Sequence, residues 1–362
     1  MNEPPQLPYG GAGDSEAGSV GLSARFRRHA DALVHSERSP LYIRLMRAAA
    51  DDIDAGGVVS RLFAGISVPP GSVPQLRLMG ALHYLVLSGH APALAEFYPS
   101  AGGDRPVDGV WPVADAAMEE RFDEVRARLH RTVQTNEPGR SAVLFAGLLW
   151  LTDRHRRPIR LLDVGASAGL NLLADRYSYI MDGRELGDPA SPLRFLEPWA
   201  PPPPIDLAMA ASLLRIVARA GCDLSPLDPT RVDDQLTLLS YIWPDELHRI
   251  DRMRAALSVA EREPVPVLAR RGSEWLAEAL DAAGDHELIV VWHSVMRQYV
   301  DPEEWRAIER ALDSRPEAVR LSMEPARNPH ARMRLTVHDP VGAPAVVLAE
   351  CDDHGIPIRW AT

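Results

Sequence analysis

The sequence predicts an α/β protein in which a helical domain precedes a parallel sheet that ends in an antiparallel hairpin. From about residue 23 to residue 153 the apolar side chains recur at helical spacing, and no convincing strand pattern is present. After Pro158, short apolar runs alternate with helical stretches, which is typical of parallel strands connected by helices. The last two runs are separated only by a turn that contains proline and glycine, which indicates a hairpin.

Three regions follow from these patterns. Residues 1–22 indicate a disordered tail, because they contain Gly, Pro and Ser and lack the charged and apolar segments of a secretion signal. Residues 23–153 are the expected helical domain, which we expect to act as a lid and to select a small substrate. Residues 154–362 are the expected sheet domain. A proline-rich stretch near 180–210 interrupts the sheet domain and indicates an inserted loop or small hairpin.

Seven strands are expected in the sheet domain, with helix signals between them. Asp301 and Pro302 offer an N-cap and a first helical proline, and Ser273 offers a similar N-cap for the preceding helix. The longest apolar run, 142–151, is about half of the roughly 20 residues that a membrane span needs, so it predicts a buried helix. The seven expected strands are 159–164, 213–222, 265–268, 288–292, 319–323, 333–338 and 345–349.

Composition excludes several classes of function. The 362 residues include 39 basic and 50 acidic side chains, and the net charge of -11 disfavours binding to nucleic acids. All 39 basic residues are arginine, which excludes a Walker A loop and a pyridoxal Schiff base, because both need lysine. Cys222 and Cys351 are too few for a cysteine-rich zinc site or a disulfide framework, and the histidines are scattered. We therefore expect no metal site, no membrane association and a cytoplasmic location.

The segment Asp163-Val164-Gly165-Ala166-Ser167-Ala168-Gly169 follows the first apolar strand and opens an apolar helical stretch. Small residues in this position allow a backbone to approach a ligand closely. A dinucleotide fingerprint requires glycines at the first, third and sixth positions, and Ser167 and Leu170 do not satisfy it. A hydrolase nucleophile elbow, Gly-x-Ser-x-Gly, matches residues 165–169 completely, with Ser167 as the nucleophile.

The place of this loop in the sheet separates the remaining interpretations. A hydrolase elbow follows several strands that are already in the sheet, whereas the region before Arg157 shows no strands and no upstream glycine-rich oxyanion loop. A methyltransferase loop follows the first strand and has an acid, a spacer and then Gly-x-Gly-x-Gly. Asp163, Gly165 and Gly169 satisfy that pattern, with Ser167 in place of one glycine. A tight turn that needs small residues only for packing stays open as an alternative.

These motifs give the chain a resemblance to known families over about residues 23–360. The chain resembles the class I, Rossmann-like methyltransferases and, more closely, an uncharacterised domain-of-unknown-function family, number 2332, that is related to them. The closer resemblance rests on Ser39-Pro40-Leu41-Tyr42, Tyr98-Pro99-Ser100 with Gly102-Gly103-Asp104, Gln134-Thr135-Asn136-Glu137, residues 165–171, and Asp223-Leu224-Ser225-Pro226-Leu227-Asp228.

The methyltransferase resemblance implies S-adenosylmethionine as the cofactor. Asp163 and the glycine loop would lie beside its methionine and ribose, and Asp223, after the second strand, would bind the ribose hydroxyls. A carboxylate suits that place because it accepts two hydroxyl hydrogen bonds at once. The alternative for Asp223 is an N-cap or turn role, and the insertion separates it from Asp163 by more than a plain βαβ unit requires. The expected cofactor-binding residues are Asp163, Gly165, Ala166, Ser167, Gly169, Asn171 and Asp223.

The chemical centre is expected where the fourth strand ends. Ligands bind outside the carboxyl ends of parallel strands, so His293 and Ser294 are expected to point toward the site. An imidazole with an ordinary pKa of about 6.5 can remove a proton from a substrate near neutral pH. A histidine that caps the strand through backbone hydrogen bonds is the alternative.

A polar cluster precedes the buried helix at 142–151. Asn136 and Glu137 are expected to orient a substrate or the cofactor, with Arg140 beside them. Alternatively, Thr135 or Asn136 caps the helix and Glu137 interacts with its dipole. The expected catalytic residues are His293 and Glu137, and the expected substrate-binding residues are Asn136, Arg140 and Ser294.

Together these observations predict an S-adenosylmethionine-dependent methyltransferase that acts on a small acceptor. Methyl transfer is an in-line displacement, so the enzyme mainly aligns the two reactants and excludes water. Two alternatives are a serine hydrolase that uses Ser167 and a non-catalytic protein with a methyltransferase fold.

Overall fold

The computed structural model describes residues 21–35, 39–69, 71–284, 286–326 and 333–361. The chain forms two compact units. Unit 1 extends to Thr135 and also includes Leu236–Asp251. Unit 2 consists of Asn136–Gln235 and of the residues from Arg252 onward. Each unit is therefore built from two segments of the chain, because the short segment Leu236–Asp251 of unit 1 interrupts unit 2.

Unit 1 is helical, and the described part of it contains no strand. Its helices are α1 Leu22–His35, α2 Pro40–Ala55, α3 Val58–Phe63, α4 Pro74–Leu87, α5 Pro92–Ala95, α6 Val110–Glu120 and α7 Phe122–Leu129, with 3-10 turns η1 Pro99–Ala101 and η2 Val107–Gly109. α2 has Pro40 in its first turn and ends at Gly56, whose φ of 73° reverses the chain. The apolar faces of the helices enclose a core that includes Phe26, Leu45 and Leu82.

Unit 2 contains an eight-stranded sheet. Its strands are β1 Ile159–Val164, β5 Ile216–Asp223, β6 Val267–Ala269, β7 Leu288–Ser294, β8 Val319–Pro325, β9 Met333–His338, β10 Val346–Cys351 and β11 Ile358–Trp360. They lie in the order β11-β10-β9-β8-β7-β1-β5-β6. β6, β5, β1, β7 and β8 pair in parallel, and β9, β10 and β11 pair antiparallel. The chain is thus an α/β protein with a mostly parallel central sheet.

The prediction of seven strands is wrong, because this sheet has eight. Each of the seven expected runs corresponds to a strand, and β9 and β10 form the expected hairpin. The prediction lacks β11, whose three residues pair with β10 at the edge of the sheet. Three residues are too few to show the alternating pattern that identifies a half-buried strand.

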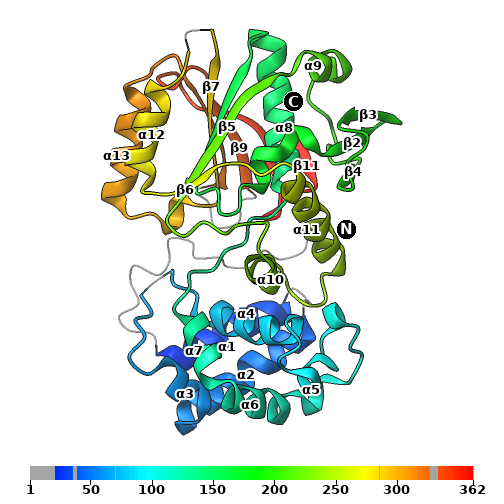
Figure 1. Ribbon diagram of the computed structural model, residues 1–362, viewed down its shortest axis with the longest axis vertical. Coiled ribbons are helices and arrows are strands. Elements are labelled where there is room, and N and C mark those ends of the chain that lie inside the picture. Colours follow the sequence, from blue (N-terminus) through cyan, green and yellow to red (C-terminus); the bar gives the residue numbers. More distant parts are fainter. Residues whose placement is uncertain (1–20, 36–38, 70, 285, 327–332, 362) are drawn as a thin grey trace. The chain divides into compact units, whose positions relative to one another are not determined.

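Helices cover both faces of the parallel strands. The helices of unit 2 are α8 Arg140–His155, α9 Leu207–Leu213, α12 Gly272–Asp281 and α13 Pro302–Asp313, and α10 Val232–Ser240 and α11 Leu247–Arg262 each lie partly in it. α12 and α13 pack together on one face of the sheet, and α8 lies on the other (Figure 1). A Cβ on Gly147 of α8 would lie 2.6 Å from the side chain of Leu321 in β8, so this glycine lets the helix approach the sheet closely.

Two helix starts test the predicted caps. The Asp301 side chain accepts hydrogen bonds from the N–H groups of Glu303 and Glu304, which confirms it as the N-cap of α13. The predicted N-cap at Ser273 is wrong, because α12 already begins at Gly272. The Ser273 N–H and hydroxyl donate instead to the carboxylate of Glu304, at 2.9 and 3.1 Å. Ser273 of α12 therefore binds a residue of α13 and does not cap its own helix.

The insertion between β1 and β5 forms a second, small sheet. Its strands, β2 Ser178–Met181, β3 Arg184–Gly187 and β4 Arg194–Leu196, lie in the order β3-β2-β4, and β2 and β3 pair as a hairpin. The Phe145 ring of α8 stacks on Tyr179 of β2 with 4.1 Å between ring centroids, and Trp199 lies beside both. These aromatic contacts attach the insertion to α8.

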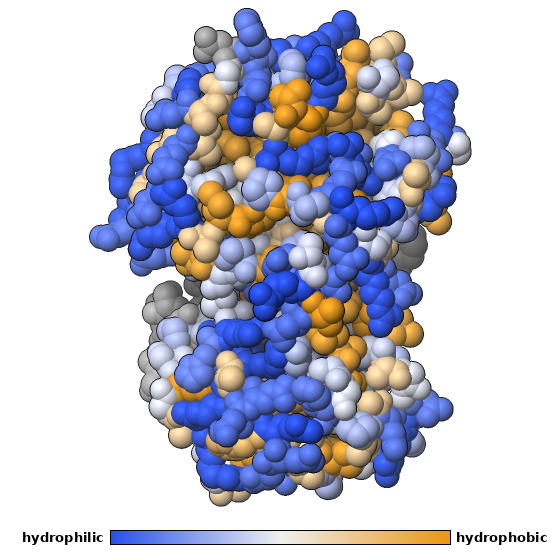
Figure 2. Space-filling view, in the orientation of Figure 1, coloured by the Kyte–Doolittle hydropathy of each residue, from blue (hydrophilic) through white to orange (hydrophobic). Residues whose placement is uncertain are grey.

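Hydrophilic side chains cover most of the molecular face shown in Figure 2. Large apolar side chains that are exposed include Leu224 at 76%, Leu196 at 71% and Val232 at 69%. Over the residues that the structure describes, no helix has both the length and the apolar character needed to cross a membrane.

Candidate functional site

The strand order of the sheet reverses at β1. From β1 the chain proceeds to β5 and β6 on one side, and it then crosses to β7 and β8 on the other side. In parallel sheets such a reversal leaves a crevice outside the carboxyl ends of the two central strands, where ligands bind. β1 ends at Val164 and β7 ends at Ser294, so the glycine loop and His293 lie at this edge. This edge is therefore the candidate site.

The glycine loop has a backbone conformation that few residues adopt. The angle φ is 80° at Gly165, 54° at Ser167 and 75° at Gly169. The N–H groups of Gly165 and Ala166 both donate to the Cys222 carbonyl of β5, at 2.9 and 3.0 Å. A left-handed conformation costs a residue other than glycine on the order of 1 kcal/mol, so its surroundings hold Ser167 in place.

Close packing explains part of the small-residue pattern. A Cβ on Gly169 would lie 2.5 Å from the Val265 side chain, and a Cβ on Gly221 of β5 would lie 2.6 Å from the Ala166 Cβ. Gly165 differs, because a Cβ there would meet the side chain of Met296 at an ordinary contact distance of 3.4 Å. The loop is thus packed on β5 at one end, and at Gly165 it faces the residues that follow β7.

Asp223 joins the end of β5 to the glycine loop. Its Oδ2 accepts a hydrogen bond from the Ser167 N–H at 3.0 Å, and its Oδ1 accepts one from the Ser225 N–H at 2.9 Å. The second bond is the turn contact that sequence reasoning gave as the alternative role for this residue. The first bond places the carboxylate against the loop, as a shared ligand would require.

Asp163 is buried next to the loop, with 3% of its surface exposed. Burial raises its pKa to about 8, the negative charge of Asp223 acts in the same direction, and Arg140 opposes both. The carboxyl group of Asp163 is therefore mostly protonated near neutral pH, and in that form it is a hydrogen-bond donor as well as an acceptor.

The segment before α8 contacts the loop through Asn136. The Asn136 Oδ1 accepts a hydrogen bond from the N–H of Leu170, the first residue of the 3-10 helix η3 Leu170–Arg176, at 3.0 Å, and Asn136 does not cap α8. Glu137 is 1% exposed, and its Oε1 accepts from the Gly139 N–H at 3.0 Å and lies 3.6 Å from Arg252. These contacts give Glu137 a part in holding the segment, and its catalytic role stays a prediction.

Arg140 and Asn171 lie on the α8 side of the loop. The Arg140 Nε donates to the Asp353 carbonyl at 3.4 Å, and the positive charge of the guanidinium partly offsets the rise in the pKa of Asp163. The Ser141 hydroxyl donates to the Asn171 Oδ1 at 2.8 Å, and Asn171 is 3% exposed. The first turn of α8 is therefore attached both to η3, which follows the loop, and to the turn between β10 and β11.

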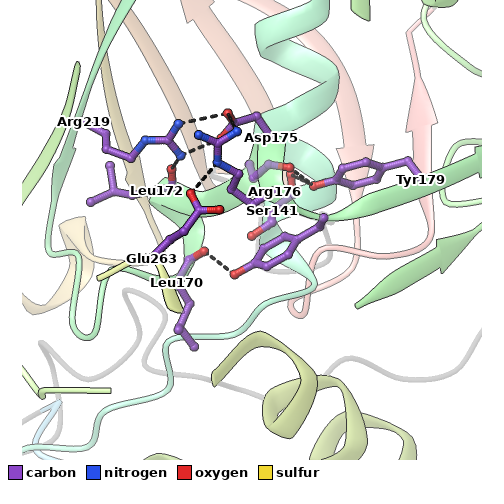
Figure 3. Close-up of polar contacts among 10 residues, drawn as sticks. Ser141, Leu170, Leu172, Asp175, Arg176, Tyr179, Arg219 and Glu263 are labelled. Carbon is purple, nitrogen blue, oxygen red and sulfur yellow. Dashed lines mark hydrogen bonds and ion pairs between the residues drawn. The ribbon is translucent and has the colours of Figure 1, made fainter. Parts of the chain in front are cut away.

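A polar network fixes the segment that follows the loop (Figure 3). Arg219 of β5 donates to both oxygens of Asp175, at 2.6 and 2.9 Å, and also to the Leu172 carbonyl. The Tyr177 hydroxyl donates to the Leu170 carbonyl at 2.7 Å. Tyr179 donates to the Ala174 carbonyl at 2.8 Å. These bonds, of which the two from tyrosine are buried and those from Arg219 partly buried, hold η3 to the sheet and keep the loop in a defined position.

His293 lies near the end of β7 and pairs with a glutamate. Its side chain is 5% exposed, and its Nδ1 is 2.8 Å from the Oε1 of Glu324 in β8. The same oxygen accepts from the N–H groups of Met296 and Arg297, at 3.2 and 3.4 Å. The imidazole meets the Trp305 ring of α13 edge-on, with 5.2 Å between ring centroids. Ser294, the next residue along β7, is partly exposed.

Ser167 and His293 lie on opposite sides of β1. Ser167 bonds through its N–H to Asp223 of β5, whereas His293 bonds to Glu324 of β8, and the strand order is β5-β1-β7-β8. Neighbouring strands are roughly 4.8 Å apart. The Ser167 hydroxyl is buried and has no hydrogen-bond partner among the described residues. The structure does not form the contact between nucleophile and base that a serine hydrolase uses.

Some buried polar atoms of residues near the carboxyl ends of the parallel strands have no partner. Ser167 Oγ, His293 Nε2 and Glu324 Oε2 make no hydrogen bond within the described chain. Such atoms are uncommon in proteins, and a ligand or an ordered water usually satisfies them. Val295, which follows β7, has a φ of 50°, which is rare for a β-branched residue and typical of functional sites.

Sequence reasoning did not identify Glu324. It lies near the end of β8, the fifth parallel strand. The rule that selected His293, namely that ligands bind at the carboxyl ends of parallel strands, also applies to this glutamate. Among the described residues there is no group of three or more His, Cys, Asp or Glu side chains that would hold a metal ion.

Comparison with known proteins places the chain in one family. Searches of curated proteins and of solved structures each found no match. A family model described as an uncharacterized protein conserved in bacteria (DUF2332) matches residues 23–360, and the chain therefore belongs to this family.

Proposed function

We propose that the protein binds S-adenosylmethionine at the carboxyl ends of β1, β5 and β7 and transfers its methyl group to a small acceptor. The observation that supports this most strongly is the bond between Asp223 and the glycine loop at the reversal of strand order. Numbered along the chain, the parallel strands lie in the order 3-2-1-4-5, which is the order of dinucleotide-binding doubly wound sheets. An adenosine cofactor is the ligand class that such a sheet and an acid at the second strand favour.

The residues at this edge fit the polar and apolar parts of that cofactor. A carboxylate has about four lone-pair positions, so Asp223 can accept ribose hydroxyls in addition to backbone N–H groups. Leu224, directly after it, is 76% exposed and offers an apolar surface for a purine ring. The protonated Asp163 and the unpartnered Ser167 hydroxyl provide donors on the β1 side. Gly165, Ala166, Gly169 and Asn171 shape the loop.

The remaining residues would align the acceptor. The cofactor supplies a methyl group on a positively charged sulfur, which makes the displacement favourable once the acceptor is in line. His293 would accept the proton of the acceptor, with Ser294 beside it. Asn136 and Arg140 would orient the bound molecules from the segment before α8. Buried positions of this kind exclude water from the reaction.

Calorimetric titration with S-adenosylmethionine tests the proposal directly. We expect saturable binding by the full chain and binding at least about tenfold weaker in Asp223→Asn, since a hydrogen bond to a charged group contributes about 1.5–3 kcal/mol. Asp228→Asn is the matched control: Asp228 lies in the same motif and bonds to Thr230, so this variant should bind as the wild type does. Thermal unfolding of both variants checks that they fold.

Two results would contradict the proposal. One is the absence of binding in the wild type, and the other is equal affinity in Asp223→Asn and Asp228→Asn. Covalent labelling of Ser167 by a fluorophosphonate, lost in Ser167→Ala, would favour the serine hydrolase instead. Binding without methyl transfer to any acceptor tested would favour a non-catalytic protein with this fold.

A further inference from the structure

We infer that Glu324 positions His293 so that the imidazole Nε2 accepts a hydrogen bond from the methyl acceptor, and that the acceptor is therefore a molecule with an O–H or N–H group. This inference rests on the proposed function. It adds a positioning residue and a substrate class, neither of which follows from binding of the cofactor.

The Glu324 carboxylate determines which imidazole nitrogen carries the proton. A carboxylate oxygen only accepts hydrogen bonds, so the Nδ1 at 2.8 Å must be the donor. In a neutral imidazole the other nitrogen, Nε2, then has a lone pair and no proton. Oε1 is itself held by the N–H groups of Met296 and Arg297. The backbone of the turn after β7, which contains Val295 at a φ of 50°, thus fixes the Glu324 carboxylate. The carboxylate in turn fixes the Nδ1–H tautomer of His293.

The environment of Nε2 indicates what kind of group it binds. Nε2 is buried and has no partner within the described chain. A buried acceptor without a partner is unfavourable, and only a donor satisfies it. Trp305 meets the ring edge-on and forms an apolar wall beside it. A hydroxyl or an amine that carries a proton fits this position, whereas an acceptor without a proton does not.

The resulting reaction is balanced. The O–H or N–H proton of the acceptor moves to His293 Nε2, and the acceptor lone pair forms the bond to the methyl carbon. The bond between that carbon and the sulfonium sulfur breaks, and its electron pair stays on sulfur as a thioether. The imidazolium that forms is stabilised by Glu324, because an opposite charge favours the charged form of its neighbour.

Matched pairs of small molecules test the inference by nuclear magnetic resonance. The full chain is labelled at its histidine side chains, and the His293 signals are assigned by their loss in His293→Gln. The probes are phenol and anisole, benzyl alcohol and its methyl ether, and N-methylaniline and N,N-dimethylaniline. We expect the Nε2 signal of His293 to shift with the proton-bearing member of at least one pair and to stay unchanged with its methylated partner. The labelled wild type should also show the Nδ1–H tautomer.

Two glutamate variants separate positioning from general structure. Glu324→Gln removes the charge with little change in shape, and we expect a loss of the fixed tautomer and at least about tenfold weaker binding of the responding probe. Glu309→Gln is the control, because Glu309 accepts from the Trp305 indole N–H at 2.8 Å and has no hydrogen bond to His293 among the described residues. This variant should keep both the tautomer and the response.

The outcomes are distinguishable from those of the cofactor test. An equal response to both members of every pair, no response to any probe, or an unchanged tautomer in Glu324→Gln overturns the inference. The wild-type measurements alone suffice for the first two results, even where a variant does not fold. The titrations are run with and without S-adenosylhomocysteine, so failure of cofactor binding is recorded separately from failure at His293.

Discussion

The side chain of Asn136 accepts a hydrogen bond from the Leu170 N–H at 3.0 Å, and both groups are buried. This contact joins the segment before α8 to the end of the glycine loop. Asn136→Ala leaves the N–H without a partner, and we expect the free energy of unfolding to fall by about 1–3 kcal/mol. Binding of S-adenosylhomocysteine should weaken as well, because the loop loses a support.

Asn136→Asp keeps an oxygen at the same position but places a carboxylate in a buried site, so we expect it to lose stability mainly at pH values at which that carboxylate is ionised. Urea unfolding and calorimetry measure the two effects. If Asn136→Ala unfolds and binds as the wild type does, the contact does not support the loop.

Gly139 and Gly355 bring two backbone segments into direct contact. A Cβ on Gly139 would lie 2.2 Å from the His354 carbonyl oxygen, and a Cβ on Gly355 would lie 2.3 Å from the Gly139 carbonyl oxygen. Either alanine variant forces backbone to move, and we expect a loss of roughly 1–3 kcal/mol in the free energy of unfolding. Gly342→Ala should have little effect, because nothing lies within 4 Å of a Cβ there. Equal unfolding curves for Gly139→Ala and Gly342→Ala would contradict this packing.

The two ion pairs in Figure 3 should differ in their effect on stability. Arg219 and Asp175 are 13% and 16% exposed, whereas Arg176 and Glu263 are 41% and 49% exposed. Arg219→Met removes both close hydrogen bonds from the largely buried Asp175 carboxylate, which keeps only the Arg176 guanidinium at 3.7 Å, and should cost about 3 kcal/mol in the free energy of unfolding. Arg176→Met should cost less than about 1 kcal/mol. A similar loss in both variants, measured with urea, would show that burial does not determine the contribution of Arg219.

Burial of Asp163 should make stability depend on pH. Its pKa rises from about 3.9 in an unfolded chain to about 8, so the folded state binds more protons between these values. The stability that Asp163 contributes is complete below its unfolded pKa of about 3.9. That stability is lost as the pH rises through its folded pKa of about 8. Asp163→Asn cannot ionise, and its free energy of unfolding should rise relative to wild type on the order of 1 kcal/mol per pH unit between about pH 5 and 8. A difference that does not change with pH would show that Asp163 stays ionised when folded.

The sequence predicted the elements whose signals are local. The parallel strands appear as continuous apolar runs because both of their faces are buried, and Asp301 caps α13 through bonds to residues two and three positions later. Ser273 failed as a cap because Glu304, 31 residues later, accepts its hydrogen bonds. β11 is too short to show a pattern of its own.

Within the site, residue types were predictable and their partners were not. Gly165, Asp223 and His293 were identified from their place after strands. The bond from His293 to Glu324 and the bond from Leu170 to Asn136 each join residues more than 30 positions apart, and only the assembled sheet brings them together. Sequence spacing also did not show that Ser167 lies toward β5 while His293 lies toward β8.

A structure determined from crystals soaked with S-adenosylhomocysteine would show whether the nucleoside binds at the end of β1. We expect density for the nucleoside beside Gly165, with the ribose hydroxyls within hydrogen-bond distance of the Asp223 carboxylate. Density at another location, or a fully soaked crystal in which Met296 still packs against Gly165 and no nucleoside is present, would contradict it.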